Sequence, residues 1–165
     1  MANKQSFTPA EWAKVLESTM LAGMAISAAD PSGLWGTLKE ALASRSALAT
    51  SKFVVSNELI KAVVADLETS EGRSALQGAL RQQVADAKPT EIVQRSLENL
   101  REVSAILDAK APDDAAAFKA FLRGISQKVA EACVEGGFLG FGGVKVSEAE
   151  KATLDDIAKA LGTTA

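Results

Sequence analysis

The spacing of the apolar residues constrains the fold of this chain more than any other feature, because it repeats every three or four positions through most of the sequence. Alternation of apolar and polar residues, the pattern of a half-buried strand, does not extend over a useful length. The clearest helical stripe follows Pro112 and consists of Phe118, Phe121, Leu122, Ile125 and Val129. The sequence therefore predicts an all-α protein.

Capping signals, prolines and glycines divide the chain into about seven helices. Thr8 and Glu11 fit a capping box around Pro9, and Phe7 and Trp12 fit the hydrophobic staple that flanks such a box. The predicted helices cover residues 9–29, 34–49, 57–68, 70–87, 89–109, 112–135 and 147–161. Together they indicate a bundle of helices.

Two of these helices carry local signals of opposite strength. Ser70 is placed to cap the fourth helix, but Gly72 and Gly78 each lower helix propensity by roughly 1 kcal/mol relative to alanine. Ser147 and Glu150, by contrast, have the spacing of a capping box at the start of the last helix. We expect a weak fourth helix and a well-defined last one.

A length of 165 residues suits one domain that buries its own hydrophobic core. We therefore treat residues 1–165 as a single helical domain. Residues 1–7 precede the first capping signal and are expected to form a flexible N-terminus. Residues 136–146 are expected to form an ordered glycine-rich loop, since large apolar residues stand between its glycines.

The composition excludes several kinds of catalytic and metal site. The chain has no histidine and no tyrosine, and Cys133 is its only cysteine. Ser-His-Asp and Cys-His catalysis are therefore excluded, as are metal sites that need imidazole or several thiolates. A metal ion would have to be bound by oxygen, which suits Ca²⁺, Mg²⁺ or Mn²⁺. We predict no enzymatic activity and no certain cofactor, with a divalent cation as the candidate.

Charge and hydropathy restrict the partners and the compartment. The net charge is −3 and no lysine or arginine cluster is present, so a nucleic-acid partner is not expected. The longest nearly apolar run, residues 20–29, is too short to span a bilayer, and no signal peptide is visible. The single cysteine favours a reducing compartment. We predict a cytoplasmic protein that does not insert into membranes.

The glycine-rich loop fits neither a P-loop nor a dinucleotide fingerprint, because a helix precedes it and Lys145 comes too late. Two interpretations of Phe138, Leu139 and Phe141 stay open. Their side chains can fill the core of the bundle, with the glycines permitting a tight path. They can also form a surface for a protein partner or a second copy, which would make the chain a homo-oligomer, most simply a dimer.

Two segments of the chain share a pattern. Residues 29–36 and 132–140 each join an acid to a Gly-apolar-apolar-Gly turn, and each leads into a helix that carries an acid. This similarity suggests two pseudo-repeated helical hairpins within one domain.

A family resemblance rests on the same two regions. The apolar helix that ends Ala-Ala-Asp at residues 28–30, its glycine turn, and the segment Gly-Gly-Val-Lys-Val-Ser-Glu-Ala-Glu-Lys at 142–151 resemble the tellurite-resistance TerB-like proteins. That family is all-helical and cytoplasmic, and it is linked to tellurite resistance and stress response. The resemblance implies a non-enzymatic accessory protein with a divalent cation site formed by Asp30, Glu40, Glu135 and Glu150.

Each of these four acids also has a purely structural interpretation. Glu150 occupies the position that a capping box requires, and Asp30 before a proline is typical of a turn. Glu40 and Glu135 can be solvated surface carboxylates. The alternative function is therefore a metal-free helical interaction module that acts as a homo-oligomer.

Overall fold

The computed structural model describes residues 2–29, 57–135 and 146–163, except for the side chains of 132–135. Within these ranges all regular structure is helical, which confirms the predicted all-α fold. The predicted helix at 34–49 and the glycine-rich loop lie outside the described residues. The elements are the short 3-10 helix η1 (Lys4–Ser6) and the α-helices α1 (Pro9–Ala29), α4 (Glu58–Glu68), α5 (Ser70–Val84), α6 (Pro89–Lys110), α7 (Pro112–Glu135) and α8 (Glu148–Ala160).

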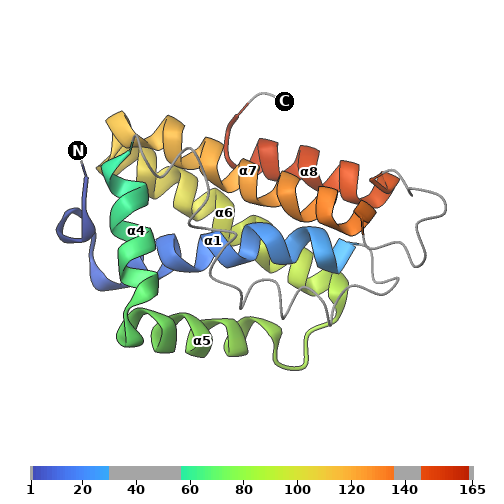
Figure 1. The fold of residues 1–165 in the computed structure, drawn as a ribbon, viewed down its shortest axis with the longest axis horizontal. Coiled ribbons are helices and arrows are strands. Elements are labelled where there is room, and N and C mark those ends of the chain that lie inside the picture. The colour runs from blue at the N-terminus through green and yellow to red at the C-terminus, as the bar shows by residue number, and fades with distance from the viewer. Residues whose placement is uncertain (1, 30–56, 136–145, 164–165) are drawn as a thin grey trace.

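Helices α1, α6, α7 and α8 form the body of the molecule. They lie along its long axis, and each of the four contacts the other three (Figure 1). Helix α4 crosses one end of this four-helix core and contacts α1 and α7, while α5 runs along its side and contacts α1 and α6. We call α4 and α5 together the α4–α5 arm. The arm is therefore built onto the core rather than into it.

Ion pairs and a hydrogen bond show the directions of the core helices. Lys110, the last residue of α6, lies 3.7 Å from Glu11 in the first turn of α1, so these two helices are antiparallel. Ser126 of α7 donates a hydrogen bond to the carbonyl of Ala22 at 2.9 Å. Ser104 of α6 donates to the carbonyl of Leu161, at the end of α8, at 3.1 Å.

The core contains the apolar stripes that the sequence predicts. Phe118 and Phe121 are fully buried and meet edge to face, with ring centroids 5.8 Å apart. A second, smaller cluster lies at the other end of α1 and consists of Leu21, Met24, Ala28 and Ile92, packed against the partly buried Leu80, Val84, Ala87 and Val93. The two clusters divide α1 between them.

The predicted start of α1 is confirmed. The Glu11 amide donates to Thr8 Oγ1 at 3.3 Å, and the Thr8 amide donates to Glu11 Oε2 at 2.7 Å. The hydrogen bond from the Thr8 amide is the main reason that the pKa of Glu11 is lowered. The rings of Phe7 and Trp12 lie 5.6 Å apart, as the hydrophobic staple requires.

The N-terminal segment differs from the flexible tail expected for residues 1–7. Residues 2–7 pack on the bundle through buried Ala2 and Phe7, and Asn3 caps the 3-10 helix η1 between them. The sequence analysis missed this because Asn3 and Ser6 form a short local cap without an apolar stripe. The ordered segment adds a strap across the end of the core.

The corner between α4 and α5 explains one glycine that seemed only to weaken a helix. A Cβ atom at Gly72 would lie 2.0 Å from the carbonyl oxygen of Asp66, so only glycine allows the two helices to approach this closely. Thr69, and not Ser70 as expected, caps α5 by accepting the Gly72 amide at 2.9 Å. At its other end α5 stops at Val84 instead of residue 87, because Asp86 adopts a positive φ of 57°.

Candidate functional site

Of the four acids in the predicted cation site, the structure describes one side chain. Glu150 lies in the first turn of α8 and is buried. Its Oε2 accepts the Ser147 amide at 2.8 Å, and its own amide donates to Ser147 Oγ at 3.2 Å. The capping box predicted from the sequence is therefore present, and one carboxylate oxygen of Glu150 is already engaged in it.

The other three acids cannot be placed around Glu150. Asp30 and Glu40 lie outside the described residues, and Glu135 ends α7 with its side chain outside them as well. Within the part of the chain that the structure describes, no group of three or more Asp, Glu, Cys or His side chains could hold a metal ion. The shared cation site of the two hairpins stays a prediction, and so does the pairing of the hairpins themselves.

The candidate interaction residues Phe138, Leu139 and Phe141 also lie outside the described residues. Whether they are buried or form a surface stays open. The described surface must therefore be searched for other features that could bind a partner.

The structure brings together two aspartates that the sequence analysis did not single out as a site. The first is Asp66 of α4, whose side chain is 16% exposed. Its Oδ2 accepts the indole N–H of Trp12 at 2.7 Å, and Lys4 Nζ lies 3.1 Å from both carboxylate oxygens. Burial raises the pKa of Asp66, but the hydrogen bonds from Trp12 and Lys4 outweigh it and leave the pKa lowered. Asp66 therefore ties the N-terminal segment, α1 and α4 together as a carboxylate.

The second is Asp114, a buried residue in the first turn of α7. One of its oxygens accepts the Ala2 amide at 2.6 Å, and the other accepts the side-chain amide of Asn57 at 2.9 Å. Asn57 in turn caps α4 by accepting the Ile60 amide at 3.0 Å. The sequence showed Asp114 only as an acid near the positive end of a helix dipole, which gives no sign of a partner 112 residues away.

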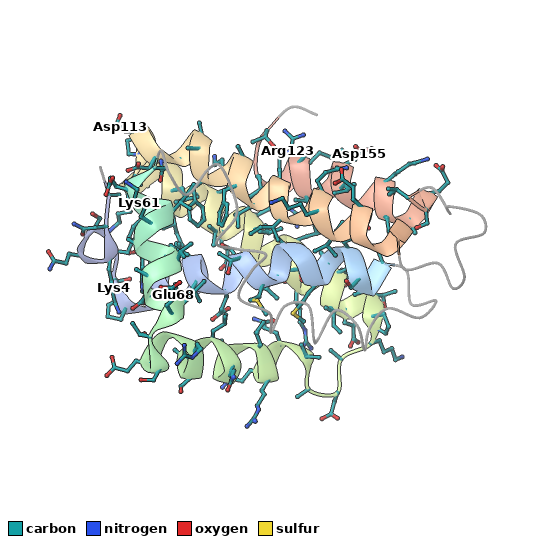
Figure 2. The ribbon with its side chains drawn as sticks, in the orientation of Figure 1. Lys4, Lys61, Glu68, Asp113, Arg123 and Asp155 are labelled. Carbon is teal, nitrogen blue, oxygen red and sulfur yellow. The ribbon has the colours of Figure 1, made fainter. Side chains whose placement is uncertain are left out.

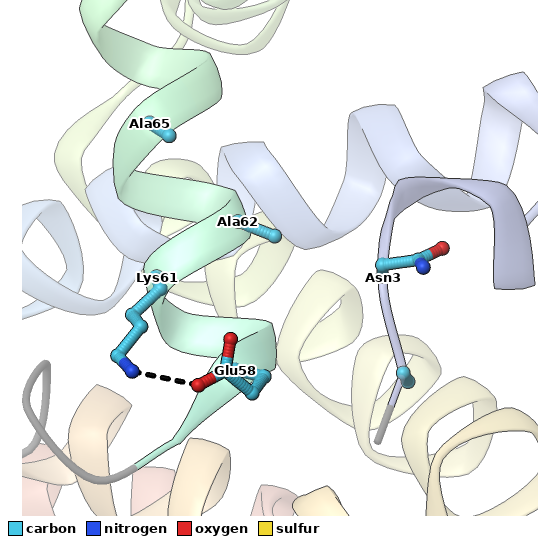
Figure 3. A pocket seen from close by; sticks show the side chains of 6 residues that line it. Asn3, Glu58, Lys61, Ala62 and Ala65 are labelled. Atoms are coloured by element: carbon cyan, nitrogen blue, oxygen red, sulfur yellow. Dashed lines mark hydrogen bonds and ion pairs between the residues drawn. The ribbon is translucent and has the colours of Figure 1, made fainter.

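A shallow groove of about 450 Å³ lies beside these anchors, between α4 and the N-terminal strap (Figure 3). Its lining residues are Ala2, Asn3, Glu58, Lys61, Ala62 and Ala65. The alanines give it an apolar floor, and Lys61 and Glu58 form an ion pair of 2.6 Å at its edge. With an open shape and its charged groups paired, the groove is suited to a protein contact more than to catalysis on a small molecule.

Helix α5 leaves much of its surface uncovered. Of its fifteen residues, only Gly72 is buried. Leu76, Leu80 and Val84 are half-buried and follow one another at intervals of four residues, so they share one side of the helix. The α4–α5 arm thus carries both the groove and the least buried of the α-helices whose side chains are fully described.

The comparisons with known proteins add no name to this description. A scan against protein-family models and searches of curated proteins and of solved structures all gave no match. The resemblance to TerB-like proteins therefore rests on the sequence motifs alone. Among the described residues, no helix has the length and apolar character needed to cross a membrane.

Proposed function

We propose that this chain is a non-enzymatic helical interaction module that acts through protein contacts, first of all with a second copy of itself. The observation that carries the proposal is the α4–α5 arm. It stands outside the four-helix core, contains a helix with a single buried residue, and borders the groove next to α4. Exposed surface of this kind, with half-buried apolar residues, is typical of sites where proteins associate.

Sedimentation velocity of the full chain at concentrations from about 10 μM to about 1 mM tests this proposal, because weak protein dimers form in this range. We expect the average mass to rise from the 17.2 kDa of one chain towards twice that value. A mass that stays at 17.2 kDa throughout the series would contradict self-association.

The motifs at 28–40 and 142–151 support a second proposal, a TerB-like accessory role in tellurite resistance and stress response. In this proposal Asp30, Glu40, Glu135 and Glu150 bind Ca²⁺, Mg²⁺ or Mn²⁺ without catalysing a reaction. The all-helical bundle agrees with what the resemblance implies. Because Glu150 Oε2 accepts the Ser147 amide, Glu150 would have to offer the ion its other oxygen.

Titration calorimetry with each ion, together with melting curves at millimolar ion, tests the cation site. A ligand that binds only the folded chain must raise its melting temperature. The variant Glu150→Gln keeps a side-chain oxygen for the Ser147 amide but lacks the charge, so we expect it to weaken ion binding while the helix stays capped. Absence of heat and of any melting shift in the unchanged chain would refute this proposal.

A further inference from the structure

One side of α4 faces away from the core, and we call it the α4 outer face. It consists of Glu58, Lys61, Ala62, Ala65 and Glu68. These residues are spaced three or four apart, so they lie above one another on the helix surface. All are exposed except Ala62, which is half-buried. The buried residues of α4, which are Leu59, Ile60 and Val63, occupy the opposite side.

The centre of the α4 outer face is small and apolar. Ala62 and Ala65 form the floor of the groove, and Ala2 and Asn3 of the N-terminal strap lie across it (Figure 3). Side chains as short as alanine let the backbone of another helix come close, as in tight helix–helix packing. The shape of the groove thus suits a helix, whereas it offers no deep cavity for a large side chain.

The two ends of the α4 outer face carry opposite charges. Lys61 lies in the first part of α4 and Glu68 is its last residue, towards opposite ends of the helix in Figure 2. Their separation of seven residues corresponds to a rise of about 10 Å along the axis. A partner of one charge sign would meet a like charge at one end of this face. A second α4 in antiparallel orientation would instead meet an opposite charge at both ends.

We propose that the α4 outer face is a homotypic contact surface on which two copies of this chain pack their α4 helices antiparallel across a two-fold axis. Lys61 of each copy then faces Glu68 of the other, and the axis passes close to Ala65, midway between them. The inference rests on the proposed self-association and assigns it to one surface. An interface formed by one eleven-residue helix and the strap is small, so we expect a weak dimer with a dissociation constant in the micromolar range or above.

Charge reversal tests the proposed pairing. In Lys61→Glu, like charges face each other at both ends of the interface, and the same holds for Glu68→Lys. We expect each variant to raise the dissociation constant measured by sedimentation about tenfold or more. The double variant Lys61→Glu/Glu68→Lys restores opposite charges, and its dissociation constant should return to within about threefold of the original. Circular dichroism verifies that each variant is folded.

The chain supplies a matched control on another helix. Lys151 of α8 forms an ion pair with Glu148 at 2.6 Å, the same distance and sequence spacing as Lys61 and Glu58. We expect Lys151→Glu to leave self-association unchanged. A further variant, Ala65→Arg, places a long charged side chain at the axis and should abolish the dimer without disturbing the core, since Ala65 is exposed.

The possible outcomes separate this inference from the function on which it rests. If the unchanged chain stays monomeric at all concentrations, both are refuted. If it associates but Lys61→Glu, Glu68→Lys and Ala65→Arg have no effect, the assignment to α4 is refuted and self-association stands. If the single reversals weaken the dimer and the double variant does not recover it, the antiparallel pairing of Lys61 with Glu68 is refuted.

Discussion

The two ends of helix α1 are attached to the rest of the molecule by different forces. At the N-terminal end, Trp12 donates to Asp66, and Glu11 is paired with both Thr8 and Lys110. At the C-terminal end, the contacts are those of the small apolar cluster around Leu21 and Met24. Hydrogen bonds and ion pairs depend on direction, whereas apolar contacts depend mainly on area. The N-terminal end is therefore held in one orientation, and the C-terminal end tolerates adjustment.

The surroundings of the two ends differ in the same sense. Leu16 belongs to the large cluster, which includes many fully buried residues of α6 and α7. Leu21 belongs to the small cluster, where four of the packing residues are only partly buried. A cavity in the large cluster is enclosed on all sides, whereas one in the small cluster can shrink as its neighbours move. This contrast can be measured with one type of substitution.

The largest expected effect comes from truncating these two leucines. We expect Leu16→Ala to lower the free energy of unfolding by about 4 kcal/mol and Leu21→Ala by about 2.5 kcal/mol, although both side chains are buried. Urea denaturation of both variants, compared at equal slope, provides the measurement. Equal losses would show that the small cluster is as rigid as the large one.

The next effect concerns the anchor of the N-terminal strap. Asp114→Ala leaves the buried Ala2 amide and the Asn57 side chain without their acceptor, and we expect a loss of about 2 to 3 kcal/mol in unfolding free energy. Asp113→Ala is the matched control, because Asp113 lies in the same helical turn but is exposed. Thermal unfolding of the two variants should differ clearly, and similar melting temperatures would mean that the strap contributes little.

These anchors mark the limit of what could be predicted from the sequence. The caps formed by Thr8 with Glu11 and by Ser147 with Glu150 were predictable, because their partners lie three residues apart. Six of the seven predicted helices match described helices for the same reason, since periodicity and caps are local signals.

Contacts between distant residues left no such signal. Trp12 and Asp66 are 54 residues apart, and nothing in their sequence neighbourhoods indicates that they meet. Gly72 looked unfavourable within a helix, and only the position of the Asp66 carbonyl shows why glycine is needed there. The candidate cation site depends in the same way on how two hairpins approach each other, so local pattern could supply its residues but not their distances.

The pH dependence of stability provides the third prediction. The pKa of Asp66 is lowered in the folded chain, so its contribution is complete above the unfolded value of about 4 and is lost as the pH falls through the folded value. We expect Asp66→Asn to cost about 1 kcal/mol at pH 7 and almost nothing near pH 2. Urea denaturation at several pH values measures the difference between the two chains.

A second carboxylate on α1 acts in the opposite direction and must be separated from Asp66. Burial raises the pKa of Glu17, and Lys14 only partly offsets this. The resulting penalty is present above the folded pKa of Glu17 and disappears as the pH falls. The comparison is therefore made in a Glu17→Gln background as well. A cost of Asp66→Asn that does not change with pH would contradict the proposed role of the charge.

The smallest expected effect tests the C-terminal end of α1 through its buried serine. Ser27 is buried, and its Oγ has no hydrogen-bond partner among the described residues, whereas buried Ser126 donates to the Ala22 carbonyl. Both serines lie within helices, so the gain in helix propensity on replacement by alanine is the same and cancels in the comparison. We expect Ser27→Ala to raise the unfolding free energy by about 0.5 kcal/mol and Ser126→Ala to lower it by about 1 kcal/mol. If Ser27→Ala is as destabilising as Ser126→Ala, Ser27 makes a polar contact of similar strength, and the two ends of α1 are held more alike than their described neighbours indicate.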